Sequence, residues 1–379
     1  MNGFATIGDA SRPVRFIQVG AGGMGRAWTH ALRASPDAEL AGLVDLDPAV
    51  ARDAARGVGM PELPIARSIT ELIGEVDADA VLNVTVPVAH HAVTTEALLL
   101  GLPVLSEKPA APTVALAMSL AATARMTGRL LMISQSRRYY RQLDAFKASF
   151  ASLGQVGMLT NDFFKAPHFG GFREDMPYPL LVDMAIHPFD VARYLLDKEP
   201  VSVYCDSFNP AWSWYNGDAA ATALFEFTGG VRFRYTGSWC SPGEETSWNG
   251  TWRASGATGA ALWDGESAPA LDTPEAGPAA PAALEVSGEQ PEEIGGALAE
   301  FVHALRTGEE PSGEAARNIG SLVMVEAAVQ SAMEGRQVQI ADVLATAFDA
   351  ALAAEVRPEV REALQAFGSA SGWRVTASI

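Results

Sequence analysis

The feature that most constrains the fold is a glycine-rich loop between an apolar run and a helical pattern. The apolar run covers Val14 to Val19, glycines follow at positions 20, 22 and 25, and a helical pattern continues over 26–34. A G-x-G-x-x-G sequence in this context is the fingerprint of dinucleotide binding. Gly20 permits the tight turn, Gly22 lets a pyrophosphate approach the backbone, and Gly25 allows close packing of helix on strand. The free N–H groups at the helix start then favour the negative phosphates.

An acidic residue occupies the position, at the end of the second strand, where this fingerprint requires one. A second apolar run, Ala38 to Val44, ends at Asp45, 20 residues after Gly25. At this spacing a carboxylate accepts hydrogen bonds from the adenosine ribose hydroxyls and repels a 2′-phosphate. The sequence therefore predicts NAD as the cofactor, with NADP less favoured. The alternative is an ordinary β–α turn followed by a solvated Asp.

Composition excludes several classes of partner. The chain has 379 residues, 48% of them apolar, which is enough to bury the cores of roughly two domains. Its formal charge of −18 repels phosphate polyanions, so we expect neither nucleic acid nor an anionic membrane as a partner. Cys205 and Cys240 are too few for a disulfide framework or a Cys-rich zinc site. Because residues 1–12 lack an apolar signal region and no apolar stretch reaches about 18 residues, we expect a cytoplasmic protein.

Residues 13–135 alternate between short apolar runs and helical patterns. This alternation predicts an α/β fold, with an N-terminal NAD(P)-binding Rossmann domain whose parallel sheet is doubly wound. Ligands bind such sheets beyond the carboxyl ends of the strands, where 20–25, 45, 83–87 and 107–109 fall. The expected strands are 14–19, 38–44, 79–84, 103–105 and 130–134, and the expected helices are 23–34, 47–57, 68–73, 90–100 and 112–126.

The pattern changes after this domain. Residues 136–340 predict a C-terminal α+β domain with a large, mostly antiparallel open sheet, which binds substrate and mediates oligomerisation. Residues 264–292 are expected to form a surface excursion, and residues 341–379 a helical C-terminal extension. The expected strands are 156–164, 200–208, 219–227, 231–239, 248–255 and 258–263, and the expected helices are 139–150, 293–306 and 314–334.

Two of these strands form an expected antiparallel hairpin around Thr228-Gly229-Gly230. A sheet covered by helices on one side leaves its other face for solvent or a partner. The hairpin is rich in aromatic residues, so we expect a homodimer or homotetramer through this sheet. The aromatic residues on which this expectation rests are Phe225, Phe227, Phe233 and Tyr235.

Glu107-Lys108-Pro109 follows a short apolar run and so places a lysine at the carboxyl end of a strand. Pro109 fixes its own φ, lacks an N–H, and permits a cis bond that directs Lys108 into a cleft. The other interpretation is a surface Glu–Lys pair of little consequence.

A second chemical element is Asp183-Met-Ala-Ile-His187-Pro-Phe-Asp190. On one helix Asp183 and His187, four residues apart, share a face, and Asp190 is also within reach of His187. An acid beside a histidine holds its tautomer and raises its basicity, which suits a general base. The alternative is a helix N-terminus with Asp183 as N-cap and a packed histidine. A metal held by His168, Asp183 and His187 matches no common zinc spacing, so we expect none.

Taken together, these motifs resemble the glucose–fructose oxidoreductase, inositol dehydrogenase and rhizopine-catabolism (Gfo/Idh/MocA) family over about residues 13–340. The resemblance rests on the joint order of several short segments. They are Gly20-Ala-Gly22-Gly23-Met24-Gly25, Asp45, Asn83 to His90, Glu107-Lys108-Pro109, Asp183 to Asp190, and Ser321 to Glu334 followed by Gly335-Arg336.

The resemblance implies an NAD(P)-dependent dehydrogenase that acts on CH–OH groups of sugars, sugar acids or cyclitols. It implies that Lys108 contacts substrate and nicotinamide, and that Asp183 and His187 form the catalytic pair with His187 as proton acceptor. The cofactor cleft is then lined by Gly20, Gly22, Gly23, Met24, Gly25, Asp45, Thr85, Pro87, His90, Glu107 and Lys108. An NAD-dependent glycosidase or oxidoisomerase without net redox change stays open, as does a dinucleotide-sensing protein without turnover.

One segment is not a general family signature. Phe164 to Asp175 supplies Lys165, His168 and Arg173, and these cations predict recognition of an anionic substrate such as a sugar acid. Arg137, Arg138 and Tyr139 follow the last expected Rossmann strand and extend this site. The alternative is a loop whose basic residues pair with local acids such as Glu174. The aromatic residues Trp212, Trp214 and Tyr215 either stack on a sugar or pack the sheet.

Overall fold

The computed structural model describes residues 3–9, 11–274, 282–286 and 288–369. The described chain forms two compact units, and each unit is discontinuous in sequence. The first contains the described parts of 1–136, 291–319 and 347–374, and the second those of 137–290 and 320–346. This division differs from the continuous ranges 13–135, 136–340 and 341–379, because segments near 300 and 360 return to the first unit.

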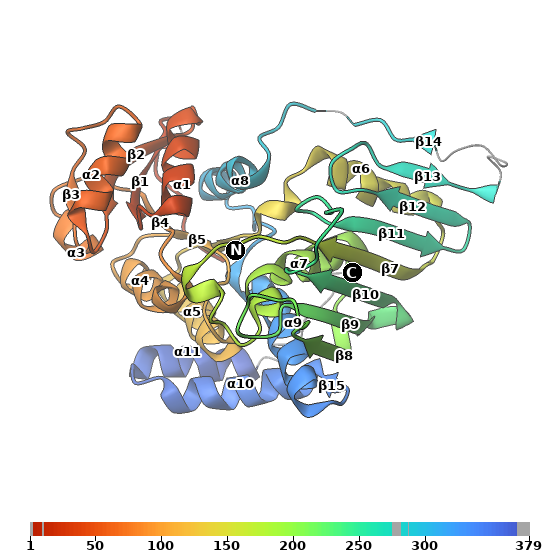
Figure 1. The fold of residues 1–379 in the computed structure, drawn as a ribbon. Coiled ribbons are helices and arrows are strands. Elements are labelled where there is room, and N and C mark those ends of the chain that lie inside the picture. The colour runs from red at the N-terminus through yellow and green to blue at the C-terminus, as the bar shows by residue number, and fades with distance from the viewer. Residues whose placement is uncertain (1–2, 10, 275–281, 287, 370–379) are drawn as a thin grey trace. The chain divides into compact units, whose positions relative to one another are not determined.

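The first unit contains a six-stranded parallel sheet in the order β3-β2-β1-β4-β5-β6 (Figure 1). This is the strand order of a Rossmann fold, and it confirms the predicted fold class. The strands are β1 (Val14–Val19), β2 (Ala38–Val44), β3 (Ile65–Ala66), β4 (Ala80–Asn83), β5 (Val104–Glu107) and β6 (Leu131–Ser134). The helices between them are α1 (Gly23–Ala34), α2 (Pro48–Gly57), α3 (Ile69–Leu72), α4 (Pro87–Leu99) and α5 (Val114–Thr127).

Local sequence explains where these helices begin and end. Asp47 caps α2 by accepting a hydrogen bond from the Ala49 N–H, and Pro48 occupies the first helical position. Thr113 caps the start of α5, while Gly128 ends it in the left-handed conformation, at φ +62°. The strands β4, β5 and β6 are buried along their whole length, as strands of a sheet covered on both faces must be.

Two later helices complete the first unit. Helix α8 (Glu293–Thr307) packs Phe301 against Phe16 of β1, with ring centroids 5.9 Å apart. Helix α11 (Pro358–Ser369) packs against α5, and Glu355 just before it accepts a hydrogen bond from Ser119 of α5. Arg357 holds the same Glu355 carboxylate at 2.7 Å and helps to keep its pKa low, at about 2. Part of the C-terminal extension therefore belongs to the first unit.

The second unit contains a nine-stranded sheet in the order β14-β13-β12-β11-β7-β10-β9-β8-β15 (Figure 1). Every pairing is antiparallel except β7 with β10, so the predicted mostly antiparallel sheet is confirmed. Its longer strands are β7 (Val156–Phe164), β8 (Pro200–Phe208), β9 (Ala220–Phe227), β10 (Arg232–Ser238), β11 (Thr251–Gly256) and β12 (Gly259–Trp263). Its short strands are β13 (Ala270–Asp272), β14 (Ala282–Ala283) and β15 (Val338–Gln339).

Helices cover one face of this sheet. Phe189 of α7 (Ile186–Leu196) contacts Phe225, Phe233 and Tyr235, with centroid distances of 4.8 to 6.3 Å. Phe146 of α6 (Arg141–Ser149) lies 6.1 Å from Trp263. Helices α9 (Ala315–Glu334) and α10 (Ile340–Ala354) contribute residues to both units.

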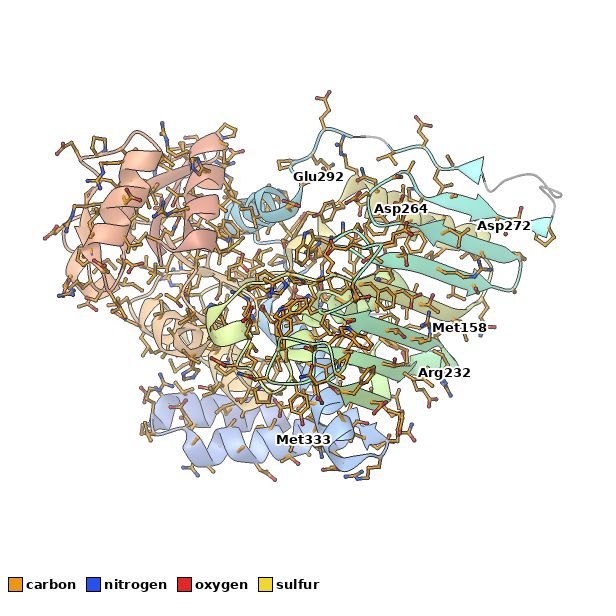
Figure 2. All side chains as sticks on the ribbon, viewed as in Figure 1. Met158, Arg232, Asp264, Asp272, Glu292 and Met333 are labelled. Carbon is orange, nitrogen blue, oxygen red and sulfur yellow. The ribbon has the colours of Figure 1, made fainter. Side chains whose placement is uncertain are left out.

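The aromatic side chains of the β9–β10 hairpin are not an exposed interface. Phe225, Phe227, Phe233 and Tyr235 are all fully buried in the second unit. The expectation that they mediate assembly is wrong, because α7 covers them within one chain. The opposite face of the sheet exposes Tyr204, Leu224 and Met158 instead. Figure 2 marks Met158 at the start of β7, opposite Arg232 on β10.

Other expectations need smaller corrections. Residues 264–292 are not only an excursion, because β13 and β14 extend the sheet there. Helix α4 begins at Pro87 rather than at residue 90, so Pro87 occupies its first turn. Strand β5 extends to Glu107, which therefore lies within the sheet. None of the helices in the described ranges is both long and apolar enough to cross a membrane.

A buried ion pair anchors α7 in the second unit. Arg138 donates from Nε and Nη2 to the two Asp190 carboxylate oxygens, both at 2.7 Å. The Ser321 hydroxyl on α9 donates to the same carboxylate at 2.5 Å. Asp190 is 1% exposed and Arg138 is 8% exposed. Asp190 therefore joins Arg138 and α7 to α9.

We predict that Asp190→Ala lowers the free energy of unfolding by about 3–5 kcal/mol, because it leaves a buried guanidinium without its carboxylate. The exposed Lys147–Asp197 pair provides the control, and Lys147→Ala should cost less than about 1 kcal/mol. Urea unfolding followed by circular dichroism measures both variants. Equal costs would show that the buried pair does not anchor α7. The double variant Arg138→Met/Asp190→Leu should recover part of the loss, because it removes both charges.

Candidate functional site

The glycine loop after β1 is held by close backbone packing. Gly20 has φ +96°, and a Cβ there would collide with the Val84 carbonyl. A Cβ on Gly25 would collide with the Gly20 carbonyl. The buried Gln18 side chain donates from Nε2 to the carbonyls of Gly20, at 2.9 Å, and Gly25, at 2.8 Å. These contacts fix the turn in one shape before any ligand binds.

The same loop leaves room on its outer side. A Cβ on Gly22 or Gly23 would meet nothing within 4 Å. Helix α1 starts at Gly23 with no side-chain cap and no acidic residue in its first turn. Its N–H groups and positive dipole end are therefore suited to a diphosphate. Met24 in the same turn is 46% exposed.

Asp45 lies at the end of β2, next to this loop. One carboxylate oxygen accepts from the Ala21 N–H at 2.9 Å, and the other accepts from the Asp47 N–H at 2.9 Å. These bonds fix the orientation of the carboxylate beside the glycine turn. Arg67 lies close by and donates from Nη2 to the Leu46 carbonyl at 2.9 Å.

A buried histidine connects the ends of β4 and β5. His90 contacts the Thr85 carbonyl through Nε2 at 2.9 Å and the Pro109 carbonyl through Nδ1 at 2.6 Å. Burial lowers the pKa of His90, with the nearby Lys108 charge acting in the same direction. Asn83 accepts from the Thr85 hydroxyl at 2.7 Å. Thr85 and His90 are thus joined to the segment that carries Lys108, and the Lys108–Pro109 bond is cis.

Glu107 is buried beneath the lysine. It accepts from the Trp28 indole N–H of α1 at 2.7 Å and from the Lys108 N–H at 3.2 Å. Burial raises the pKa of the Glu107 carboxyl above its usual range. Glu107 ties the end of β5 to α1, whereas the Lys108 side chain is only half-buried.

Asp183 and His187 lie in the second unit, on two different helical segments. Asp183 belongs to a π-helical turn, Leu180–Met184, and α7 begins afterwards at Ile186. The expectation of one continuous α-helix is therefore wrong here, and so is that of Asp183 as an N-cap. Arg173 donates from Nε to Asp183 at 2.6 Å. Single π-helical turns in α-helical segments are frequent at functional sites.

A narrow pocket in the second unit contains His187. Aromatic rings, an arginine and an amide surround the imidazole. The lining residues are Arg137, His187, Pro188, Val191, Trp248, Asn249, Trp252 and Trp263. None of the lining residues, all within the described ranges, is acidic.

The basic segment expected to form an anion site is neutralised locally. Lys165 pairs with Glu245 at 2.8 Å, and Arg173 pairs with Asp183. His168 stacks on Trp214, with ring centroids 3.8 Å apart. Lys165, His168 and Arg173 therefore do not form a free cationic cluster.

Some of the aromatic and arginine residues near this segment make packing contacts within the second unit, and others line the His187 pocket. Tyr215 donates its hydroxyl to the Pro167 carbonyl, and Trp212 donates its N–H to the Cys240 carbonyl. Tyr139 is half-buried between the 3₁₀ turn Ser136–Arg138 and α6. Of the two arginines before it, Arg138 is engaged by Asp190 and Arg137 lines the His187 pocket.

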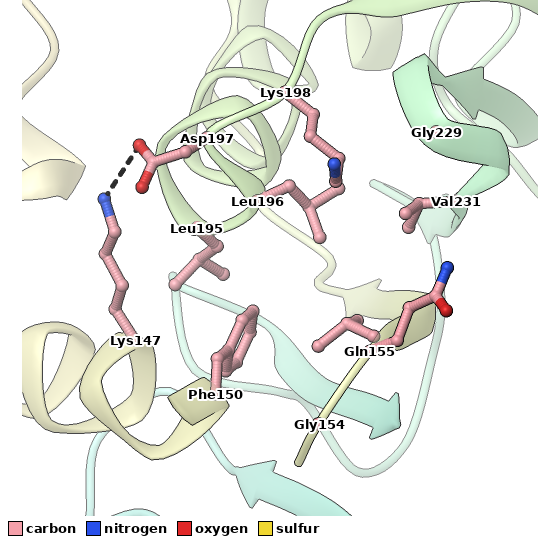
Figure 3. A pocket seen from close by; sticks show the side chains of 11 residues that line it. Lys147, Phe150, Gly154, Gln155, Leu195, Leu196, Asp197, Lys198, Gly229 and Val231 are labelled. Carbon is pink, nitrogen blue, oxygen red and sulfur yellow. Dashed lines mark hydrogen bonds and ion pairs between the residues drawn. The ribbon is translucent and has the colours of Figure 1, made fainter. Parts of the chain in front are cut away.

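A larger cavity of about 430 Å³ lies elsewhere in the second unit, where α6 and α7 end (Figure 3). Its wall includes the apolar side chains of Phe150, Leu195 and Leu196, and Lys198 extends into it. Lys147 and Asp197 pair across its edge at 3.2 Å. None of the residues predicted for catalysis or cofactor binding lines this cavity. Within the described ranges, no group of three or more His, Cys, Asp or Glu side chains is arranged to hold a metal ion.

Comparison with known proteins assigns both halves of the chain to one family. Residues 14–135 match the oxidoreductase family model with the NAD-binding Rossmann fold, and residues 153–262 match the Gfo/Idh/MocA C-terminal domain model. The chain belongs to the Gfo/Idh/MocA oxidoreductase family. NAD is the cofactor of this family's N-terminal domain, and the glycine loop, the open helix start and Asp45 fit it.

Individual relatives of this Gfo/Idh/MocA protein are distant. It is 27% identical over 261 residues to the uncharacterized protein y4oX of Sinorhizobium fredii, across 66% of this chain and 72% of that protein. It is 29% identical over 202 residues to an inositol 2-dehydrogenase of Rhizobium meliloti, across 50% of this chain and 57% of that enzyme. The matched region therefore spans little more than half of the dehydrogenase.

A solved structure supports the fold. An oxidoreductase from Agrobacterium radiobacter, crystallised with NAD+, L-tartaric acid and magnesium, superposes with a TM-score of 0.79 at 20% identity. The superposition covers 87% of this chain and 99% of that one. At this identity the likeness establishes the shared fold.

Sequence reasoning missed several residues of these sites. Gln18 lies inside the first apolar run and looks like an interruption of a strand, although it locks the glycine turn. Arg67 is 22 residues beyond Asp45, and only the pairing of β2 with β3 brings it close. Trp248 and Asn249 precede β11 and Trp252 lies on it, and all three are far in sequence from His187.

The glycine turn gives a sharp test of the cofactor site in this Gfo/Idh/MocA protein. Gly22→Ala should change the unfolding free energy by less than about 1 kcal/mol, because its Cβ meets open space. It should weaken NADH binding by about tenfold or more, equivalent to about 1.4 kcal/mol, because the methyl group occupies the diphosphate approach. Gly25→Ala should lose about 1–3 kcal/mol of stability as well, through overpacking. Fluorescence titration with NADH and thermal melting separate the two effects, and wild-type affinity in Gly22→Ala would contradict this site.

Proposed function

We propose that this protein is an NAD-dependent dehydrogenase that transfers a hydride between nicotinamide and a secondary alcohol of a sugar, sugar acid or cyclitol. The observation that carries the proposal is His187 in a pocket of aromatic and hydrogen-bonding side chains, in a chain whose other unit is an NAD-binding Rossmann domain. A protein that only senses a dinucleotide needs no proton acceptor in such a pocket.

The first unit supplies the cofactor residues. We assign the diphosphate to Gly22, Gly23 and Met24 at the start of α1, with Gly20 and Gly25 shaping the turn. We assign the adenosine ribose to Asp45, which disfavours the 2′-phosphate of NADP. We assign Thr85, Pro87, His90 and Glu107 to the nicotinamide side of the cleft, at the carboxyl ends of β4 and β5.

The acid–base chemistry belongs to Lys108, Asp183 and His187. When bound, the nicotinamide accepts or donates the hydride. We assign to His187 the removal of the hydroxyl proton as the carbonyl forms. Lys108 then donates a hydrogen bond to the developing alkoxide and lowers the free energy of the charge that forms there. Asp183 either orients His187 or binds a neighbouring hydroxyl, and Arg173 donates to its carboxylate from Nε at 2.6 Å.

Relatives support the substrate class. The curated proteins that match this chain include inositol 2-dehydrogenases and a 1,5-anhydro-D-fructose reductase of Ensifer adhaerens. Trp248, Trp252 and Trp263 line the His187 pocket and offer apolar faces to C–H groups of a substrate. We further propose that the exposed sheet face around Tyr204 and Leu224 joins copies of the chain into a homodimer or homotetramer.

The proposal is tested by screening sugars, sugar acids and cyclitols with NAD and NADP, followed at the nicotinamide absorbance. We expect net NADH formation with at least one member. Substrate consumption without net NADH would indicate a glycosidase or oxidoisomerase instead, and NADH binding without any conversion would indicate a sensor.

With the substrate found, we predict that His187→Ala lowers turnover by roughly 10²–10⁴-fold, the usual loss for a general base. The affinity for NADH should stay unchanged, because the cofactor residues lie in the first unit. The control is Lys147→Ala at the separate cavity, which should leave turnover unchanged. Wild-type turnover in His187→Ala would remove this residue from the mechanism.

Cofactor choice gives a further prediction. Asp45→Ala should raise the kcat/KM ratio of NADP to NAD by roughly tenfold or more, because it removes repulsion of the 2′-phosphate. Arg67 is close enough to bind that phosphate once Asp45 is gone. The double variant Asp45→Ala/Arg67→Ala should therefore lose most of the gain. A native preference for NADP would contradict the role of Asp45.

A further inference from the structure

The cavity at the ends of α6 and α7 lies wholly within the second unit (Figure 3). Its volume of about 430 Å³ falls in the range of about 300–1,000 Å³ that is typical of sites for small organic ligands. Its walls come from the end of α6 with the 3₁₀ turn Phe150–Ser152, the start of β7, the end of α7 and the hairpin turn Thr228–Gly230. None of its lining residues, all within the described ranges, is assigned to the cofactor or to catalysis.

Backbone hydrogen bonds hold two sides of this cavity in place. The Thr228 N–H donates to the Glu199 carbonyl at 2.9 Å, which ties the hairpin turn to the segment after α7. On another side, the Ala257 N–H donates to the Gln155 carbonyl at 3.1 Å and holds the segment before β7. The cavity therefore keeps its shape without a ligand, and a ligand does not have to spend binding free energy on ordering these segments.

Lys147 at the edge of the cavity is engaged by the protein itself. Its Nζ lies 3.2 Å from an Asp197 carboxylate oxygen and 3.9 Å from the centroid of the Tyr194 ring. The Tyr194 hydroxyl in turn donates to Asp144 at 2.9 Å. Because Lys147 and Asp197 form a pair that is neutral as a whole, Lys147 gives the edge its structure rather than a net charge.

Lys198 is the other cation of this cavity, and its side chain extends into it (Figure 3). Among the described residues its ammonium group has no carboxylate or hydrogen-bond partner, whereas Lys147 and Lys165 each meet a carboxylate. With two lysines and one aspartate, the lining residues carry a formal charge of +1, in a chain whose net charge is −18. A local positive site on an acidic protein attracts small anions.

We propose that this cavity binds a small organic anion, whose carboxylate or phosphate group lies on Lys198 and whose apolar part packs on Phe150, Leu195 and Leu196. An ammonium group is a compact point charge and binds either kind of anionic group. The apolar side chains add a surface that a simple inorganic anion does not use. The site is separate from the residues proposed for the dehydrogenase, so its test does not depend on that function.

The main alternative is that Lys198 only balances the carbonyl groups at the end of α7. Cations near a helix C-terminus interact favourably with its dipole, and α7 ends at Asp197, the residue before Lys198, in the left-handed conformation at φ +47°. Within the described chain, however, no hydrogen bond joins Lys198 to those carbonyls. The alternative needs no ligand, and it predicts that removal of Lys198 affects stability alone.

The test uses the whole protein and four probes, which are hexanoate, hexyl phosphate, neutral hexanamide and acetate. Saturation-transfer NMR measures the dissociation constant of each probe. We expect the better of the two hexyl anions to bind at least about tenfold more tightly than hexanamide, because only an anion pairs with the ammonium group. Acetate should bind at least about tenfold more weakly than hexanoate, because it lacks the apolar chain. The tighter of the two hexyl anions identifies the head group.

Variants assign the binding to the cavity. Lys198→Met should weaken binding of the hexyl anions by about tenfold or more, and that of hexanamide by less than about threefold. Lys198→Arg keeps the charge and should keep most of the affinity. Lys165→Met removes the same charge elsewhere in the second unit and should change the affinities less than about threefold. Gln155→Trp adds a ring to the cavity wall from an exposed position, and should weaken binding of every probe.

Circular dichroism and thermal melting show whether each variant is folded, and Gln155→Trp keeps the test decisive if Lys198→Met does not fold. Equal affinity of the native protein for the hexyl anions and hexanamide, or no saturable binding of any probe, would overturn the proposal. Native affinity in Lys198→Met or Gln155→Trp would place the anions elsewhere in the chain and overturn it as well. If Lys198→Met melts at a lower temperature but binds as the native protein does, Lys198 serves only the end of α7.

Discussion

The contact between the Gly20 and Gly25 backbones is the constraint on which the cofactor unit depends. No side chain fits between these two positions, and Gln18 bonds to both carbonyls from inside the sheet. The close approach sets where α1 begins and hence where its unbonded N–H groups point. It also sets the place of Asp45, whose carboxylate is held by the Ala21 N–H of the same turn. A binding site for a diphosphate and a ribose follows from one tight backbone contact.

In the second unit, ion pairs with carboxylates engage several of the basic side chains that the sequence offers for substrate binding. The sequence offers Arg137, Arg138, Lys165 and Arg173 near the substrate domain, and charge alone does not distinguish them. Folding brings Asp190, Glu245 and Asp183 to three of them. Glu245 is 80 residues from Lys165 in sequence, so no local pattern indicates their pairing. The number of basic residues in a loop therefore overestimates the positive charge that a substrate encounters there.

The parts that sequence predicted well depend on short-range patterns. Five parallel strands of the first unit are mainly apolar runs bounded by glycine, proline or capping residues, and their ends lie within a few residues of prediction. The two-residue strand β3 was not predicted. The β9–β10 hairpin follows from its alternation and its glycine turn. Alternation shows only that one face is apolar, however, and not whether a helix or a second chain covers it. For Phe225 and Tyr235 the covering residue is Phe189 of α7, which lies more than 30 residues earlier in the sequence. The short strands β13 and β14 show no alternation of apolar and polar residues, and only their pairing with neighbouring strands identifies them.

Arg137 and Arg138 are neighbours in sequence, yet their side chains have different surroundings in the folded chain. They are adjacent in a 3₁₀ turn, and their side chains take different directions. Arg138 is enclosed by Asp190, so its charge is used to hold α7 in place. Arg137 lies in the pocket of His187, where its Nη1 donates to the Asn249 side-chain oxygen at 2.7 Å. The Asn249 amide in turn donates to the Gly265 carbonyl at 2.8 Å, which fixes the position of that side chain. The two adjacent arginines therefore have different places in the second unit, because Arg138 pairs with α7 and Arg137 lines the pocket of His187.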